Sequence, residues 1–437
     1  MPVNDELTPM EASYIATNAY FTLKDWISEK PVAGVESYGT VHNRVLGKGD
    51  KGKIDPAKAN PSLAGTALGG ASLGQIFTAR TGFATSGFGY VLQLQQGNRS
   101  HVVIATRGTR PEMPGLPDIL TDLRGAMTPF GDFGPVHKGF KRTFDSILPQ
   151  LDKESDRVIT NADVVHCVGH SLGGAVATLV AAHYRQRGKT VKLYTFGSPR
   201  VGAFATYAAF HQAIGQPNIL RVAHDLDPIS LIAPFPYIHV NPSPSDDNNL
   251  TIPSPTGQLF STANHDMNQY ILSVGGVNAS WDMARGKTGQ VDHDNAVLAR
   301  WLLHEDNDPG WVQYASAKTL SLLFKLFAHV LRTQSTVLIM RLSALDLLVE
   351  LLLNGLYKTA ALGAQVYTML RHAATWAGIK VAAGAEFTAQ ILRRIVAAML
   401  SRLQQIAIQA LGAVTRELVP LPLLIAGGWQ LAQGLML

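Results

Sequence analysis

Cysteine is almost absent from this chain, with Cys167 as its single copy in 437 residues. One cysteine excludes an internal disulfide and a cysteine-rich metal site. Since Cys167 stands in an apolar run, we expect a small buried side chain there. Charged residues are scarce as well, at 16% against 46% hydrophobic residues. A chain of this length and composition can bury a large core and is long enough for two domains.

The chain also lacks the patterns typical of nucleic-acid binding and of secretion. It contains neither zinc-finger spacing nor a basic run interleaved with aromatic residues, so no nucleic-acid partner is expected. Its start, MPVNDELTPMEASYI, is acidic where a secretory signal needs a basic start and an apolar core. We expect a protein that is cytoplasmic as made, with membrane association or signal-peptide-independent export left open. Residues Thr8–Glu11, TPME, predict a capped helix start instead.

Positive charge is concentrated in the C-terminal part. From Val312 onward there are 11 basic and 4 acidic residues, a net charge of +7 in a chain whose total is +5, so the preceding part carries −2. This part is also the most hydrophobic, and residues 418–437 contain no charged residue. A basic, apolar tail favours an anionic membrane surface as its partner. We therefore predict two domains, residues 1–311 and a helical region at 312–437.

Short apolar runs alternate with helical patterns over residues 1–311. Residues 89–94, 101–106, 163–168, 191–196 and 218–223 predict strands, and residues 12–29, 138–155 and 175–184 predict helices. Residues 45–75, 110–135 and 241–260 predict loops, the second with a short helix near 118–124. Strands that alternate with helices predict an α/β fold with a mainly parallel sheet.

One serine between two glycines stands between a predicted strand and a predicted helix. The stretch GHSLG, Gly169–Gly173, follows the apolar run 163–168. A sharp strand–turn–helix connection places a serine hydroxyl above the sheet, and flanking glycines avoid Cβ clashes. Ser171 is therefore the candidate nucleophile, with a helix N-cap as the other interpretation. The second match, GASLG at Gly70–Gly74, has no strand before it, so we expect Ser72 in a loop or at a helix start.

A serine nucleophile needs a base and an acid. In α/β hydrolases the chain order is serine, then Asp or Glu, then His. The predicted strand 218–223 is followed by Asp225 and Asp227, and both are candidates for the acid. His265 lies between a polar loop and an apolar segment and is the candidate base, whose imidazole a carboxylate must orient.

Five short motifs follow one another along the first domain, and their order is informative. They are IATRGT at Ile104–Thr109, DILTD at Asp118–Asp122, VHKGF at Val136–Phe140, VGHSLGG at Val168–Gly174 and TFGSPRVG at Thr195–Gly202. Together they make the region between Ser13 and Leu303 resemble the class 3 lipases, relatives of the filamentous-fungal triacylglycerol lipases. The resemblance implies an α/β-hydrolase fold and a serine ester hydrolase. Its substrate would be a glycerolipid, either neutral lipid or phospholipid.

A sixth stretch of the resemblance concerns the acid. The stretch DPISLIAP, Asp227–Pro234, followed by Tyr-Ile-His at 237–239, resembles the family pattern D-x-V-P-x-L-P-P and then Y-x-H. This alignment implies that Asp227 is the acid and that His239 belongs to the framework. Ser230 stands where the family has proline, so Asp225 stays open as the alternative acid.

The same resemblance implies the base and the oxyanion donors. His265 and Tyr270 resemble the family's H-x-x-x-Y, which makes His265 the base, with His293 as the rival. Thr109 stands where the family places one oxyanion donor, and the N–H of Leu172 at a helix N-terminus would supply the other. We expect no cofactor and no metal. The acidic stretch SDDNN at 245–249 is interpreted as a solvated loop, with metal binding as the alternative.

The C-terminal part lies outside the resemblance. Residues around 318–332, 336–358 and 386–416 predict amphipathic helices with broad apolar faces, and 418–437 is a marginal candidate for a membrane span. A soluble bundle that caps the hydrolase, a membrane-associating domain and an oligomerisation bundle all fit this pattern. The second implies an alternative function, a membrane-binding or membrane-perturbing protein. A loose analogy to bacterial lipase effectors also implies an inhibitor or chaperone that covers the hydrophobic tail.

Overall fold

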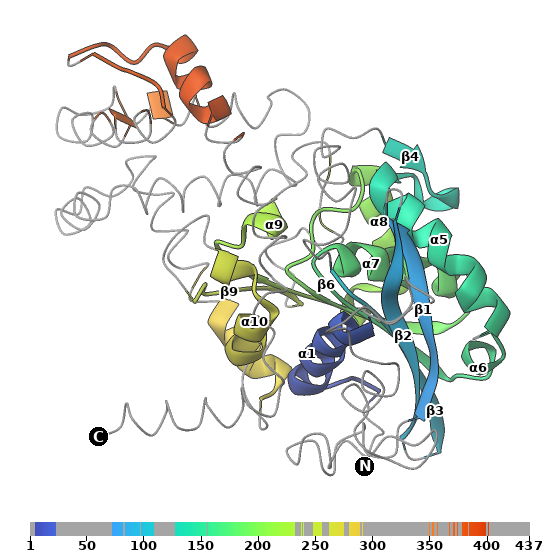
Figure 1. Ribbon diagram of the computed structural model, residues 1–437. Helices are drawn as coiled ribbons and strands as arrows, with labels where there is room; N and C mark the ends of the chain where they lie inside the picture. Colours follow the sequence, from blue (N-terminus) through green and yellow to red (C-terminus); the bar gives the residue numbers. More distant parts are fainter. Residues whose placement is uncertain are drawn as a thin grey trace, which may run out of the picture.

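The computed structural model is an α/β fold built around a seven-stranded sheet (Figure 1). Neighbouring strands from β3 to β9 are parallel, whereas β1, β2 and β3 form an antiparallel meander. This mainly parallel sheet confirms the predicted fold class. The structure describes residues 5–22, 72–81, 84–96, 98–108, 127–154, 156–231, 237, 239, 248–255, 262–274, 279–288, 291 and positions between 349 and 401.

The sheet has the order β1-β2-β3-β6-β7-β8-β9, and a separate ribbon pairs β4 with β5. The strands are β1 (Ser72–Thr81), β2 (Ala84–Gln96), β3 (Arg99–Thr106), β4 (Met127–Pro129), β5 (Pro135–His137), β6 (Val164–His170), β7 (Thr190–Phe196), β8 (Ile219–His224) and β9 (Asn249–Ile252). The α-helices are α1 (Pro9–Asn18), α5 (Lys138–Glu154), α6 (Asp156–Thr160), α7 (Leu172–Gln186), α8 (Phe204–Ile214), α9 (Pro228–Leu231) and α10 (Met267–Val274). Short 3-10 turns are η1 (Ala19–Thr22), η4 (Gly131–Phe133), η5 (Gln216–Asn218) and η6 (Thr262–His265).

Both faces of the sheet are covered, so its central strands are apolar on both sides. Helices α1 and α10 pack on one face with Val103 and Val168, and helices α5, α7 and α8 pack on the other with Ile104 and Cys167 (Figure 1). Neighbouring residues of a strand point to opposite faces, so each strand supplies both cores. Every residue of β6 is buried, which explains its unbroken apolar run. Cys167 is buried as expected.

The predicted helix start near the N-terminus is confirmed. The hydroxyl of Thr8 accepts a bond from the Glu11 N–H, and the Glu11 carboxylate accepts one from the Thr8 N–H, which together make a capping box. Leu7 just before the helix is held by side chains from elsewhere in the fold. The Tyr194 hydroxyl accepts from its N–H, and the Trp281 indole donates to its carbonyl. The N-terminal segment is thereby fixed against β7.

Three predicted loops contain strands. Ser72 begins β1 and does not lie in a loop or at a helix start, because residues 72–81 pair with β2 along their length. The stretch NLTI, Asn249–Ile252, lies in the predicted loop 241–260 but forms β9 at the edge of the sheet beside β8. The ribbon of β4 and β5 starts inside the predicted loop 110–135. Each of these strands is short or at an edge, where pairing with a neighbour decides the structure more than the local apolar pattern does.

Most of the predicted C-terminal region lies outside the described residues, including the domain boundary at 311–312. Residues 389–398 are helical and lie inside the third predicted helix, 386–416. Leu392 in this helical stretch and Phe387 just before it are buried. Within the described part of the chain, no helix combines the length and apolar composition that crossing a membrane requires.

Candidate active site

Ser171 occupies a strained turn between β6 and α7. Its φ of 59° and ψ of −132° make it the one non-glycine residue with positive φ among those the structure describes. Such a conformation costs about 1–3 kcal/mol and persists only where the surroundings enforce it. The N–H of Ser171 donates to the carbonyl of Phe196 on β7, and its carbonyl accepts from Gly174. Ser171 makes no side-chain cap to α7, which excludes the N-cap interpretation.

Two glycines allow the turn to be this tight. A Cβ at Gly169 would lie 2.4 Å from the carbonyl carbon of Gly173. A Cβ at Gly173 would lie 2.3 Å from the carbonyl oxygen of Thr106 on β3. Both contacts are with backbone, so neither neighbour can move aside cheaply. The glycines of GHSLG are therefore required by close approach of the chain, as the sequence pattern predicts.

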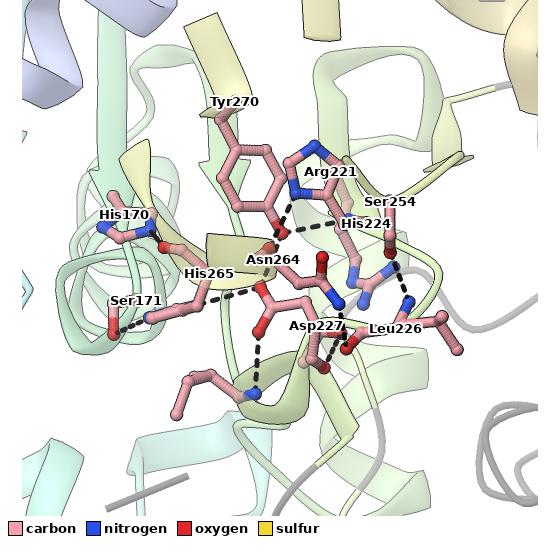
Figure 2. A network of polar contacts seen from close by, with 12 residues as sticks. His170, Ser171, Arg221, His224, Leu226, Asp227, Ser254, Asn264, His265 and Tyr270 are labelled. Atoms are coloured by element: carbon pink, nitrogen blue, oxygen red, sulfur yellow. Dashed lines mark hydrogen bonds and ion pairs between the residues drawn. The ribbon is translucent and has the colours of Figure 1, made fainter. Parts of the chain in front are cut away.

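The structure brings Ser171, His265 and Asp227 together in one hydrogen-bonded row (Figure 2). The Nε2 atom of His265 lies 2.9 Å from the Ser171 hydroxyl oxygen, and Nδ1 lies 2.9 Å from Oδ2 of Asp227. A carboxylate accepts only, so Nδ1 carries the proton and Nε2 is the acceptor for the serine O–H. His265 and Asp227 are fully buried and Ser171 nearly so. The three side chains come from the ends of β6 and β8 and from η6.

Asp227 and Asp225 have different partners. Asp227 accepts from His265 and from the Tyr270 hydroxyl at Oδ2, and from the N–H of Ile229 at 2.7 Å at Oδ1. The Asp225 carboxylate instead accepts from the N–H and the hydroxyl of Ser254, at 2.9 and 2.6 Å. Asp225 thus fixes the loop after β9, while Asp227 is the carboxylate beside the candidate base.

Tyr270 supports Asp227 as a neutral donor. Its hydroxyl donates to Oδ2 of Asp227 at 2.5 Å and accepts from the N–H of His224 at 3.0 Å. Burial, and then the negative charge of Asp227, hold the pKa of Tyr270 well above its usual range. The phenol therefore stays protonated and keeps its bond to the carboxylate.

The candidate oxyanion donors are described only in part. Leu172 is the first residue of α7, where helix N–H groups have no intrahelical acceptor. Thr109 lies outside the described residues, but the chain that leads to it is tied down by Arg107. The buried Arg107 guanidinium donates to the carbonyls of Gly87 and Gly108, at 2.6 and 2.7 Å.

Further sequence candidates lie outside the described residues: the rival base His293, the stretch Asp118–Asp122, and the acidic residues of the stretch 245–249. His239 is buried and contacts Arg221 and the carbonyl of Ser230, as suits a framework residue. Within the described residues, no group of three or more His, Cys, Asp or Glu side chains is placed to hold a metal ion.

Three buried residues around the candidate base were missed by sequence reasoning. His170, His224 and Tyr20 contact the turn that carries His265, or each other, through hydrogen bonds. His170 stands in the quoted GHSLG, but nothing in the pattern indicates its partners. His224 directly precedes Asp225, and Tyr20 is 150 residues from its partner His170. Neither residue therefore stands in a local pattern that would indicate a role at the site.

Comparison with known proteins gives a family match and several similar sequences. Residues 103–236 match the family described as lipase (class 3). The chain is 38% identical over 113 residues to secreted mono- and diacylglycerol lipase 1 of Fusarium solani, covering 24% of this chain and 33% of that one. It is 31% identical over 140 residues to toxin TseL of Vibrio cholerae, covering 31% and 20%.

Two further similarities extend over more of the chain. Phospholipase A1-II 4 of Oryza sativa subsp. japonica is 28% identical over 232 residues, covering 46% of this chain and 56% of that one. The structure of mono- and diacylglycerol lipase from Aspergillus oryzae superimposes with a TM-score of 0.40 at 20% identity, covering 64% of this chain and all of that one. The matched part of this chain thus spans between a fifth and a little over half of the length of these curated relatives.

Proposed function

Because residues 103–236 match the family described as lipase (class 3), we propose that this protein is a serine ester hydrolase of that family. It cleaves the acyl esters of glycerolipids through an acyl-enzyme intermediate. Ser171 is the nucleophile, His265 the general base and Asp227 the acid that orients it. The observation that carries the proposal is the buried row Ser171–His265–Asp227, with 2.9 Å at each step.

Acylation begins when Nε2 of His265 takes the Ser171 proton as the oxygen attacks the ester carbonyl. The tetrahedral oxyanion forms above the start of α7, where the N–H of Leu172 stabilises it. Thr109 supplies the second donor in this proposal. The protonated His265 then donates its proton to the leaving alcohol, and the acyl group stays on Ser171. Asp227 stabilises the imidazolium that exists between these two transfers.

Deacylation repeats the same steps with water. His265 removes a proton from the water, which attacks the acyl carbonyl, and the proton returns to Ser171 as the fatty acid leaves. These steps use protein groups and water, so no cofactor is required. The N–H of Ile229 and the phenol of Tyr270 both donate to the buried Asp227 carboxylate and keep it in place throughout.

The substrate class is proposed from the relatives. Matches to lipases of mono- and diacylglycerol and to a phospholipase A1 share acyl glycerol esters as their chemistry. The experiment is therefore a panel of neutral glycerides and phospholipids incubated with the full chain, with released fatty acids and lysolipids identified by mass spectrometry. Ser171→Ala should release no product, and Ser72→Ala is the control because Ser72 lies on β1. Equal product from Ser171→Ala and the unaltered chain would overturn the proposal.

A second candidate function rests on the match to toxin TseL. In this proposal the protein is a membrane-directed toxin, its C-terminal region binds an anionic membrane surface, and an inhibitor or chaperone covers that region. Dye leakage from vesicles of non-hydrolysable ether lipids separates the candidates. Leakage that persists in Ser171→Ala would support membrane perturbation as a separate activity. Leakage confined to ester-lipid vesicles, and lost in Ser171→Ala, would support hydrolysis alone.

A further inference from the structure

The turn that carries His265 is held by two buried imidazoles (Figure 2). Nε2 of His170 lies 3.0 Å from the carbonyl oxygen of His265, and Nδ1 of His224 lies 2.7 Å from the carbonyl oxygen of Asn264. Because a carbonyl only accepts, both of these nitrogens carry a proton. Two consecutive carbonyls of the base turn thus each receive one histidine N–H.

The other nitrogen of each ring faces a hydroxyl. The Tyr20 hydroxyl lies 2.6 Å from Nδ1 of His170, and the Ser273 hydroxyl lies 2.8 Å from Nε2 of His224. In a neutral ring this second nitrogen is an acceptor, so each hydroxyl donates to it and fixes the tautomer. Burial lowers the pKa of both histidines, which agrees with neutral rings.

The same rings stack on the candidate base and on the phenol that supports the acid. The His170 ring lies on that of His265, with centroids 4.6 Å apart and planes inclined by 29°. The His224 ring lies on that of Tyr270, with centroids 4.0 Å apart and planes inclined by 20°. His170 therefore backs the base, and His224 backs the phenol that bonds to Asp227. Neither ring carries a charge that would oppose an imidazolium on His265.

We propose that His170 and His224 are positioning residues for His265, acting through the carbonyls of His265 and Asn264, and that Tyr20 sets the tautomer of His170. The inference rests on the proposed function, because His265 needs fixing only if it is the base. It ties the N-terminal segment to catalysis, since Tyr20 lies on η1 and His170 directly precedes the nucleophile. A displacement of the base by 1 Å can cost about 10²-fold in rate.

The test uses substitutions that keep or remove each N–H. In His170→Gln the amide nitrogen takes the place of Nε2, and in His224→Asn it takes the place of Nδ1. His170→Leu and His224→Leu remove the donors. On a short soluble ester, the leucine variants should lose about 10²-fold in kcat with KM changed little, and the amide variants should recover at least about tenfold of that loss. Amide and leucine variants with equal kcat would overturn the inference.

Tyr20 supplies an independent test that does not depend on the leucine variants folding. Tyr20→Phe should lower kcat about tenfold in the unaltered chain, because His170 can then adopt the other tautomer. An amide has no tautomer to set, so Tyr20→Phe should change kcat little in a His170→Gln background. Equal losses in both backgrounds would contradict the tautomer role.

Ser171→Ala is measured in the same assay to separate two kinds of failure. If the unaltered chain shows no ester hydrolysis, or Ser171→Ala matches it, the proposed function fails. If Ser171→Ala is inactive while all His170 and His224 variants keep full kcat, only the positioning role fails.

Discussion

Gly197 lies against the candidate base and acid, so a single methyl group there tests whether their geometry matters. In Gly197→Ala the new Cβ would lie 2.6 Å from Oδ2 of Asp227, where ordinary contact begins at 3.4 Å, a shortfall of 0.8 Å. It would also lie 3.0 Å from Nδ1 of His265 and 3.0 Å from the Tyr270 hydroxyl. Relief of the clash must separate the His265–Asp227 pair or shift both. A displacement near 1 Å predicts a loss of about 10²-fold in kcat.

Backbone strain must be separated from this clash. Gly197 has a φ of +53°, and an alanine in such a conformation costs roughly 1–2 kcal/mol in stability. Gly188 provides the matched control, because its φ is +79° and a Cβ there would meet nothing within 4 Å. Gly188→Ala should lose similar stability but keep its activity.

The assay is kcat on a soluble ester beside urea unfolding of both variants. Full activity in a folded Gly197→Ala protein would refute the reasoning, since a methyl group would then fit beside Asp227 without consequence.

Other predictions concern the acid and pH. Asp227→Asn should slow turnover by roughly 10⁴-fold, because the imidazole of His265 would take the wrong tautomer. Asp225→Asn should slow turnover far less, because the Asp225 carboxylate bonds to Ser254 and not to the base. The reverse ranking in steady-state rates would contradict the assignment. Burial lowers the pKa of His224 to about 4, below the ordinary 6.5, so its stabilising contribution is complete above pH 6.5 and is lost as the pH falls toward 4. That loss amounts to about 3 kcal/mol, and urea unfolding between pH 7.5 and 4.5 measures it; a flat profile would contradict a buried neutral ring.

The nucleophile region was predictable because local chemistry determines it. An apolar run before GHSLG and small residues after it require a strand, a tight turn and a helix, and the clashes at Gly169 and Gly173 show why no larger side chain fits. The main parallel strands were predictable for a related reason, since strands buried on both faces are continuous apolar runs.

Contacts between distant segments could not be predicted in this way. Strand β9 has the polar surroundings of a loop, and its pairing with β8 forms only after the chain folds back. The bonds of Tyr20 to His170 and of His224 to Asn264 join segments that no periodicity links. The acid is an intermediate case: Asp225 and Asp227 follow the same strand two residues apart, so position alone left both open, and only the family resemblance implied Asp227.

Covalent labelling tests the central claim most directly. A fluorophosphonate carrying an alkyl chain should modify the full chain once, at Ser171, and the labelled peptide is identified by mass spectrometry. The reaction requires the serine hydroxyl to be activated by its neighbours, so Ser171→Ala should remain unlabelled and His265→Ala should react far more slowly. The account predicts one adduct on the peptide that contains GHSLG. An adduct at Ser72 or elsewhere, or undiminished labelling of His265→Ala, would contradict it.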